Sequence, residues 1–302
     1  MTKLIFIPPS WDSTRYREHF TAEAEARGVE VVFLGAPVTP DDLANSKRLI
    51  IAQSVSAEIA PLVDDSWVVL HIENPQGVVD LFHTMHPEEG VRWAATHGSA
   101  GLAMSAWLLE LGARPHRAHD LLSWADLDLP GTDEPGAPPT TSPLPDNPLT
   151  FYTGVSIPKD KAWTWAPGML DGDDPSALAA ARWIDITGSA RHIINGPYIF
   201  LPAGRWKATL TVSIDIESSN PTFVCQWGGA AHETSVCEVN IRHSGHYEIT
   251  IESQLAWPDA VRFLFASKTA LFSGRVRIGD LRIQREQEDS PKAPTVSRLS
   301  VA

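Results

Sequence analysis

The segment Arg205–Ile216 alternates between apolar and polar side chains over its whole length. Successive side chains of a β-strand point to opposite faces of a sheet, so the pattern predicts a strand with one buried and one exposed face. Such a strand needs a second layer that covers its apolar face, which favours two packed antiparallel sheets. The residues expected in the buried layer are Trp206, Ala208, Leu210, Val212, Ile214 and Ile216.

The same two-residue period returns in His246–Glu252 and in Gly274–Arg285. Gly279 shifts the phase within the second of these segments, as a β-bulge would. Together with other short apolar runs bounded by turn residues, these segments make about eight predicted strands. We therefore expect residues 151–285 to form an antiparallel, jelly-roll-like β-sandwich domain.

Residues 1–125 alternate between strand-like and helix-like segments instead. Buried strands are predicted over Lys3–Pro9, Val29–Gly35 and Trp67–Ile72, and a helix is predicted over Ser13–Gly28. This alternation is typical of a parallel sheet covered by helices, so we expect a small, Rossmann-like α/β domain.

The turn after the first predicted strand, Pro8–Ser13, has no glycine for a phosphate to approach. Its prolines also lack the amide donors that hold a nucleotide phosphate. No nucleotide is expected to bind there, and no cofactor is expected elsewhere in the chain.

The two predicted domains are separated by residues 126–150, which contain seven prolines and no hydrophobic period. Proline favours the extended polyproline II conformation, so this segment is interpreted as an extended linker. Residues 286–302 are polar and unpatterned, and they are expected to form a disordered tail.

The chain carries a formal net charge of −13, which argues against nucleic acid and anionic membrane surfaces as partners. No apolar run approaches the ~20 residues that cross a bilayer, and Leu4–Pro9 is too short for a signal peptide. The expectation is synthesis and retention in the cytoplasm, or release without the general secretion route, for example inside a larger particle.

Two motifs in the first domain invite a catalytic or metal-binding interpretation. Ser99 lies in Thr96–Ala103, which resembles a nucleophile elbow but has His97 where that motif requires glycine. A helix start or a tight helix–helix contact is the favoured interpretation. His83 and His86 are three residues apart, but zinc needs a third protein ligand that the sequence does not identify.

Asp126 and Asp128 have the Asp-x-Asp spacing with which many glycosyltransferases hold a metal ion, and Asp171–Asp174 offers a similar set of carboxylates. The tripeptide is common by chance, so solvated acidic loops are favoured, and no catalytic or metal-binding residue is expected. Cys225 and Cys237 lie in neighbouring predicted strands and are expected to be buried thiols that can pair if oxidised.

Tryptophan is the more informative residue type, with 11 in the chain. An indole ring can bury the C–H face of a sugar, but aromatic side chains in strands usually fill a sandwich core. Trp206 is in phase with the apolar face and is expected in the core. Trp227 precedes two glycines and Trp257 precedes Pro258, so these two are the predicted glycan-stacking residues.

The stretches "GPYIFLPAGRWKATLTVSID", "SGHYEITIES" and "GRVRIGDLRIQR" resemble the β-sandwich domains of carbohydrate-binding modules, of a kind found in bacterial proteins associated with surface polysaccharides. The resemblance runs from about residue 182 to 285 and rests on strands and turns, so it transfers no binding residues. It implies that the sandwich binds a polysaccharide or makes contacts within an oligomer.

Two functional hypotheses follow. The first is a non-catalytic protein that binds a cell-surface or capsular polysaccharide, as the receptor-binding spike or fibre of a phage-like particle, with a homo-oligomer or larger assembly as its setting. The alternative is a cytoplasmic transferase of capsule biosynthesis whose α/β domain is catalytic and whose sandwich is accessory. The first is preferred because the sequence offers no convincing catalytic residues.

Overall fold

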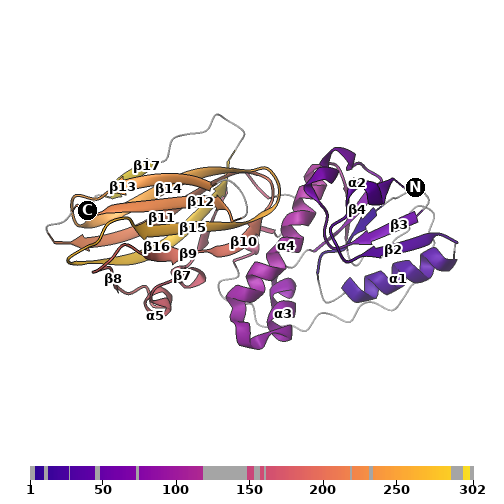
Figure 1. The fold of residues 1–302 in the computed structure, drawn as a ribbon. Helices are drawn as coiled ribbons and strands as arrows, with labels where there is room; N and C mark the ends of the chain where they lie inside the picture. Colours follow the sequence, from indigo (N-terminus) through magenta and orange to yellow (C-terminus); the bar gives the residue numbers. More distant parts are fainter. Residues whose placement is uncertain are drawn as a thin grey trace. The chain divides into compact units, whose positions relative to one another are not determined.

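The structure is a computed structural model in which the chain divides into two compact units, Met1–Ile157 and Pro158–Ala302 (Figure 1). The described residues are 4–9, 13–26, 28–44, 48–72, 75–117, 148–152, 157–159, 161–217, 220–230, 234–286 and 295–299.

Unit 1 contains a five-stranded sheet in the order β2-β3-β1-β4-β5, and all four of its pairings are parallel. The strands are β1 (Leu4–Phe6), β2 (Glu30–Leu34), β3 (Arg48–Ala52), β4 (Trp67–His71) and β5 (Arg114–Arg117). The order differs from the 3-2-1 arrangement of a dinucleotide-binding half. The predicted α/β class is confirmed.

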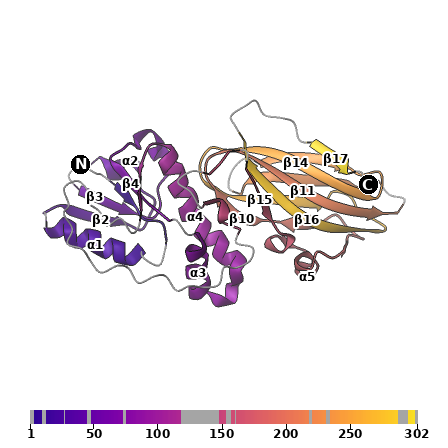
Figure 2. The same cartoon turned by 180° about the vertical axis from the view of Figure 1, so that it is seen from behind.

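Helices connect these strands (Figures 1 and 2). They are α1 (Ser13–Ala26), α2 (Pro40–Leu43), α3 (Pro75–Met85) and α4 (Gly90–Glu110), with short 3-10 turns η1 (Ala57–Leu62), η2 (Pro87–Glu89) and η3 (Thr150–Tyr152). Gly28 follows α1 at φ +66°, the left-handed conformation that commonly ends a helix. At the start of α2, the amide of Thr39 donates to Asp42 Oδ2 at 2.9 Å.

Unit 2 consists of two six-stranded sheets, β13-β12-β15-β9-β7 with β10 paired to β15, and β17-β14-β11-β16-β6 with β8 paired to β16. The strands are β6 (Ala162–Trp165), β7 (Asp171–Gly172), β8 (Ile184–Asp185), β9 (His192–Asn195), β10 (Pro197–Leu201), β11 (Gly204–Ile216), β12 (Thr222–Gly229), β13 (Thr234–Asn240), β14 (Gly245–Leu255), β15 (Asp259–Ser267), β16 (Gly274–Arg285) and β17 (Thr295–Leu299). Two short helical segments, η4 (Pro167–Met169) and α5 (Pro175–Ala179), lie beside them.

All pairings between these strands in the described residues are antiparallel, and the apolar faces of the two sheets supply one core, so the predicted β-sandwich is confirmed. Its largest fully buried side chains are Trp165, Trp206, Trp227, Phe223, Phe263 and Phe265. The bulge expected at Gly279 is present, because the register of β11 and β16 shifts between Leu210 and Val212. A Cβ at Gly279 would come within 3.1 Å of the Thr211 carbonyl oxygen.

Three details differ from expectation. The tail contains a strand, because β17 pairs with the edge of β14 and so receives the backbone partners that an isolated polar segment lacks. Unit 2 begins at residue 158 and not 151, because the aromatic turn η3 buries Phe151 and Tyr152 within unit 1. The predicted linker lies outside the described residues except for 148–150, so its extended form stays a prediction.

Candidate functional site

The two tryptophans predicted to stack on sugars lie in different environments. Trp227 is fully buried, and its indole Nε1 donates to the Trp206 carbonyl at 3.2 Å. The assignment of Trp227 to glycan stacking was therefore wrong, because a ring without exposed surface cannot contact a sugar. The glycines after it continue strand β12 and do not form a loop. Trp257 is partly exposed in the turn between β14 and β15, so its role stays a prediction.

The motifs of unit 1 have structural roles. Ser99 is fully buried inside α4 and its hydroxyl donates to the Thr96 carbonyl at 2.6 Å, so this hydroxyl is not available at the surface as a nucleophile. The expected helix–helix contact is present, since a Cβ at Gly98 would lie 2.7 Å from Val78 of α3. His86 packs against the Trp93 ring at 4.7 Å between centroids. Among the described residues, no group of three or more His, Cys, Asp or Glu is placed to hold a metal ion.

The acidic loop Asp171–Asp174 is used structurally in part. Asp173 forms an ion pair with Arg191, and Asp174 caps α5 by accepting the Ala177 amide at 2.9 Å. Asp126 and Asp128 lie outside the described residues.

The cysteines face each other. Cys225 and Cys237 are directly opposed partners on β12 and β13. Cys225 is fully buried, whereas Cys237 is partly exposed. No helix among the described residues is long and apolar enough to cross a membrane.

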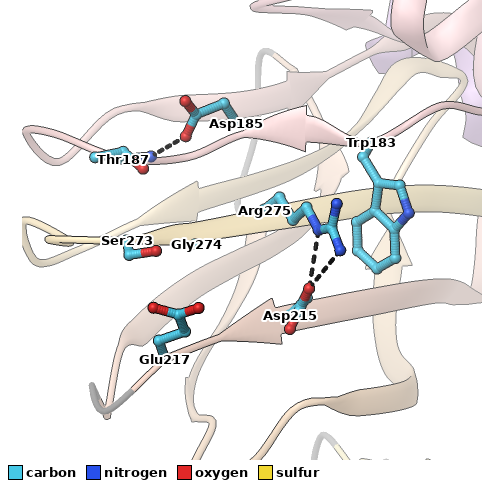
Figure 3. A pocket seen from close by; sticks show the side chains of 8 residues that line it. All are labelled: Trp183, Asp185, Thr187, Asp215, Glu217, Ser273, Gly274 and Arg275. Carbon is cyan, nitrogen blue, oxygen red and sulfur yellow. Dashed lines mark hydrogen bonds and ion pairs between the residues drawn. The ribbon is translucent and has the colours of Figure 1, made fainter.

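An open hollow of about 400 Å³ lies where β8, β11 and β16 meet at one end of a sandwich sheet (Figure 3). Its lining side chains point outward from these strands, opposite to the core residues that alternate with them. The residues that carry its chemistry are Trp183, Asp185, Asp215, Glu217, Ser273 and Arg275. We call this the Trp183 hollow.

Trp183 is 36% exposed and forms the aromatic wall of the hollow. The guanidinium carbons of Arg275 and Arg277 lie 4.8 and 5.3 Å from its ring centroid. Cations at these distances are attracted to the indole π-system. The two arginines alternate along β16 on the same face as Trp183, so the sheet itself fixes the orientation of the ring.

Arg275 is held in turn by Asp215 of β11. Its Nε and Nη2 both lie 2.8 Å from Asp215 Oδ2, and both contacts are drawn in Figure 3. Asp215 Oδ1 accepts the Ser244 hydroxyl at 3.3 Å. A continuous chain of contacts therefore runs from the start of β14 to the indole ring, and it orders the hollow without a ligand.

The opposite wall of the hollow is the turn after β8. Asp185 Oδ1 accepts the Thr187 amide at 2.8 Å, and Arg191 donates to the carbonyls of both residues. The hydrogen bonds from Thr187 hold the pKa of Asp185 below its usual value, and the charge of Arg191 acts in the same direction. Asp185 is thus a fixed, ionised acceptor at neutral pH.

The rim of the hollow is formed by the loop between β15 and β16. Phe272 is 98% exposed there and directly precedes Ser273, which lines the hollow. Within the described residues, no hydrogen bond or ion pair reaches the side chains of Ser273 and Glu217, and no dashed line joins them in Figure 3. The hollow therefore contains polar groups held by hydrogen bonds or ion pairs, together with two side chains, Ser273 and Glu217, that are available to a ligand.

The alternation of "WIDIT" places Trp183, Asp185 and Thr187 on one face of a strand, and this signal is visible in the sequence. The alternation shows only which side chains share a face, and the strand β8 is only two residues long, so it does not single out Trp183 as a site residue. The neighbours of Trp183 come from segments 90 residues further along the chain, and no local pattern predicts that pairing.

No protein-family model and no curated protein matches the chain. Among solved structures it is similar to a family 61 carbohydrate-binding module in complex with β-1,4-galactotriose, with 11% identity, 39% of this chain and 87% of that chain covered, and a TM-score of 0.26. It is also similar to the family 35 module from Cellvibrio japonicus Abf62, with 12% identity, 47% of this chain and 100% of that chain covered, and a TM-score of 0.26. A third similar structure holds the family 22 carbohydrate-binding module and the family 10 glycoside hydrolase module of Clostridium thermocellum xylanase 10B, complexed with xylohexaose. The identity is 11%, the match covers 44% of this chain and 26% of that chain, and the TM-score is 0.25. Carbohydrate-binding modules are thus among the solved structures to which this chain is similar.

Proposed function

We propose that unit 2 binds carbohydrate and that the Trp183 hollow is its binding site. The observation that carries the proposal is a partly exposed indole ring whose position is fixed by Arg275 and Arg277 at the wall of an open, polar hollow. A sugar ring presents an apolar C–H face beside a rim of hydroxyl groups. Burial of that face against a fixed ring gains free energy without first ordering the ring.

The polar groups of the hollow suit the hydroxyl rim of a sugar. Asp185 and Glu217 offer acceptors for hydroxyl donors, and Ser273 offers both a donor and an acceptor. Hydrogen bonds to ionised groups are stronger than neutral ones, which gives direction and specificity to a weak apolar contact. Phe272 supplies a second exposed ring next to Ser273. Exposure of this apolar ring to water is unfavourable, and contact with a ligand would bury it.

The proposed ligand is a cell-surface or capsular polysaccharide, and the proposed role is non-catalytic binding. A single shallow site exchanges water for protein partners at small net gain, so monovalent affinity is expected to be weak. Several copies on one particle or oligomer would raise the avidity by roughly 10²-fold through effective concentration. A receptor-binding spike or fibre of a phage-like particle is the setting that fits such a binder.

Trp257 is proposed as a second, separate contact. It lies beyond the end of β14, whereas Ser244 of the Trp183 hollow network precedes its start. Eleven residues of extended strand separate these ends by about 35 Å. One sugar unit cannot touch both tryptophans, so a contribution from Trp257 requires a long glycan.

The alternative role, a transferase of polysaccharide synthesis, makes a different demand on unit 1. It requires a nucleotide-sugar site, and a bound nucleotide stabilises the native state by mass action. A dose-dependent rise in Tm with nucleotide sugars and Mg²⁺ would favour it over the binding role.

The proposal is tested with the full chain on an array of bacterial and plant polysaccharides, followed by titration of each glycan that binds. Trp183→Ala is expected to weaken binding roughly ten-fold or more, because aromatic anchors dominate binding energies. Phe33→Ala is the matched control, since Phe33 is a 40% exposed ring in unit 1. The proposal fails if no glycan binds to the full chain, or if the two variants have equal effects.

A further inference from the structure

The charged groups around the Trp183 hollow differ in whether they have a partner. Arg275 is bound by Asp215, and Arg277 lies over the indole ring with its Nη2 3.5 Å from the Ser213 hydroxyl. On the opposite wall, Arg191 is held by Asp173. These three arginines are therefore already engaged by the protein.

Glu217 is the exception among these charges. It is exposed just after the end of β11, and no hydrogen bond or ion pair within the described residues reaches its carboxylate. Figure 3 shows this carboxylate below Ser273, on the side of the hollow opposite Asp185. Within the described residues, Asp185 and Arg277 also lack an ion pair but carry opposite charges, so the named charged groups around the hollow sum to one net negative charge.

We propose that Glu217 is a specificity-determining residue that excludes acidic sugars from the Trp183 hollow. The inference rests on the proposed carbohydrate function and names the ligand class, which is a glycan whose bound unit carries no carboxylate, sulfate or phosphate. A hydroxyl of a neutral sugar donates to Glu217 and keeps its hydrogen bond on leaving water. A carboxylate, sulfate or phosphate at the same place cannot donate a hydrogen bond to Glu217, and its negative charge is repelled by that of Glu217.

Two features of the site set the size of this effect. Because Glu217 is exposed, solvent screens its field, and the discrimination should resemble that of surface charge pairs, roughly two- to five-fold in affinity. Because the interaction is between exposed charges, the discrimination should shrink as salt shortens the Debye length. Asp215 and Asp173 already neutralise Arg275 and Arg191. The third arginine, Arg277, is offset by the carboxylate of Asp185, so the charge of Glu217 is not cancelled.

The test uses β-1,4-linked oligosaccharides that differ only in charge, namely mannan against polymannuronate oligomers, and cello-oligomers against their C6-oxidised forms. Chitosan oligomers supply an ammonium-bearing arm. The full chain is compared with Glu217→Gln, and Asp280→Asn is the matched control, because Asp280 is an exposed carboxylate of the same sheet that does not line the hollow. Dissociation constants are measured at low and high salt.

For wild-type protein we expect tighter binding of the neutral member of a pair. Glu217→Gln should strengthen binding of the acidic member about two- to five-fold and weaken binding of chitosan. It should also weaken binding of the neutral member, because an amide oxygen is a weaker acceptor than a carboxylate, so the acidic-to-neutral affinity ratio should rise. Asp280→Asn should leave all these ratios unchanged.

Two outcomes overturn the inference separately from the proposed function. If Trp183→Ala weakens binding but Glu217→Gln leaves the acidic-to-neutral ratio unchanged, carbohydrate binding stands and the role of Glu217 falls. If wild-type protein prefers the acidic member through Trp183, the ligand class is wrong. If no glycan of the polysaccharide array binds through Trp183, the proposed site fails and the inference falls with it.

Discussion

Trp227 lies on the inner face of one sandwich sheet and Trp183 on the outer face of the other. The two rings show how the same residue type serves two purposes. Trp227 belongs to the inner face, where it is fully buried, lies 6.3 Å from the Phe263 ring between centroids, and has its indole donor satisfied by a carbonyl. Trp183 belongs to the outer face, where its ring is oriented by two arginines and more than a third of it stays exposed. A neighbouring loop or glycine does not decide which purpose a tryptophan serves; the face of the sheet does.

The sharpest way to break this comparison is to remove each ring in turn. Trp227→Ala should lower the free energy of unfolding by about 3–5 kcal/mol, because it deletes a large buried side chain and leaves a cavity. Trp183→Ala should cost less than about 1 kcal/mol, because the ring is partly solvated and its arginines keep other partners. Urea denaturation monitored by circular dichroism checks both values. Equal destabilisation by the two variants would contradict the distinction.

Two ion pairs extend the comparison to charges on the outer face. Arg205 and Glu252 form a pair whose side chains are 8% and 11% exposed, whereas the side chains of Arg275 and Asp215 are 56% and 41% exposed. Arg205→Met should lower stability by about 2–3 kcal/mol, since it leaves a largely buried carboxylate without its cation. Arg275→Met should cost less than about 1 kcal/mol, since water solvates the remaining Asp215.

The same denaturation experiment checks this pair of variants, with Glu252→Gln in the Arg205→Met background as a control. The double variant should recover part of the lost stability, because the unpaired charge is gone. A larger loss from Arg275→Met than from Arg205→Met would show that burial does not govern these pairs.

The cysteines offer a third comparison of the inner and outer environments, within one cross-strand pair. Cys225 donates a hydrogen bond to Cys237, and this bond and burial both raise the pKa of Cys225. Acceptance of the same hydrogen bond lowers the pKa of Cys237, and this effect outweighs burial, which raises it. Only thiolates are alkylated readily, so Cys237 should react with iodoacetamide at pH 8 at least about ten-fold faster than Cys225. Peptide mass spectrometry over a time course measures both rates, and equal labelling in the folded protein would refute the assignment.

The smallest expected effect concerns pH. Because Thr187 holds the pKa of Asp185 below its ordinary value of 3.8, the ionised carboxylate stabilises the turn fully above that value. The contribution is lost as the pH falls through the lower, folded pKa. Asp185→Asn should therefore unfold with a shallower acid dependence than wild type between pH 5 and about pH 3. Urea denaturation midpoints of both proteins across this pH range test the prediction. If the midpoints of the two proteins fall equally as the pH is lowered, Asp185 does not stabilise the turn.

Much of the fold is predictable because burial imposes a period on each strand. The alternation of Arg205–Ile216 predicts both faces of β11, and Gly279 predicts the bulge in β16, since both depend on neighbours in sequence. The segment "PYIFLPAGRW" illustrates the limit of such patterns. It predicts two strands around a turn, but β10 pairs with β15 and β11 pairs with β14 and β16, so the turn passes from one sheet to the other.

The sequence alone determined which side chains face outward, because a two-residue period follows from backbone geometry. "WIDIT", "SIDIE" and "GRVR" each carry their polar or aromatic members on alternate positions. Only the tertiary structure decided that these members meet, because the pairings of Asp185 and of Asp215 with Arg275 join segments far apart in the chain. It also placed Trp227 inside and Trp183 outside, because exposure depends on what the facing sheet covers.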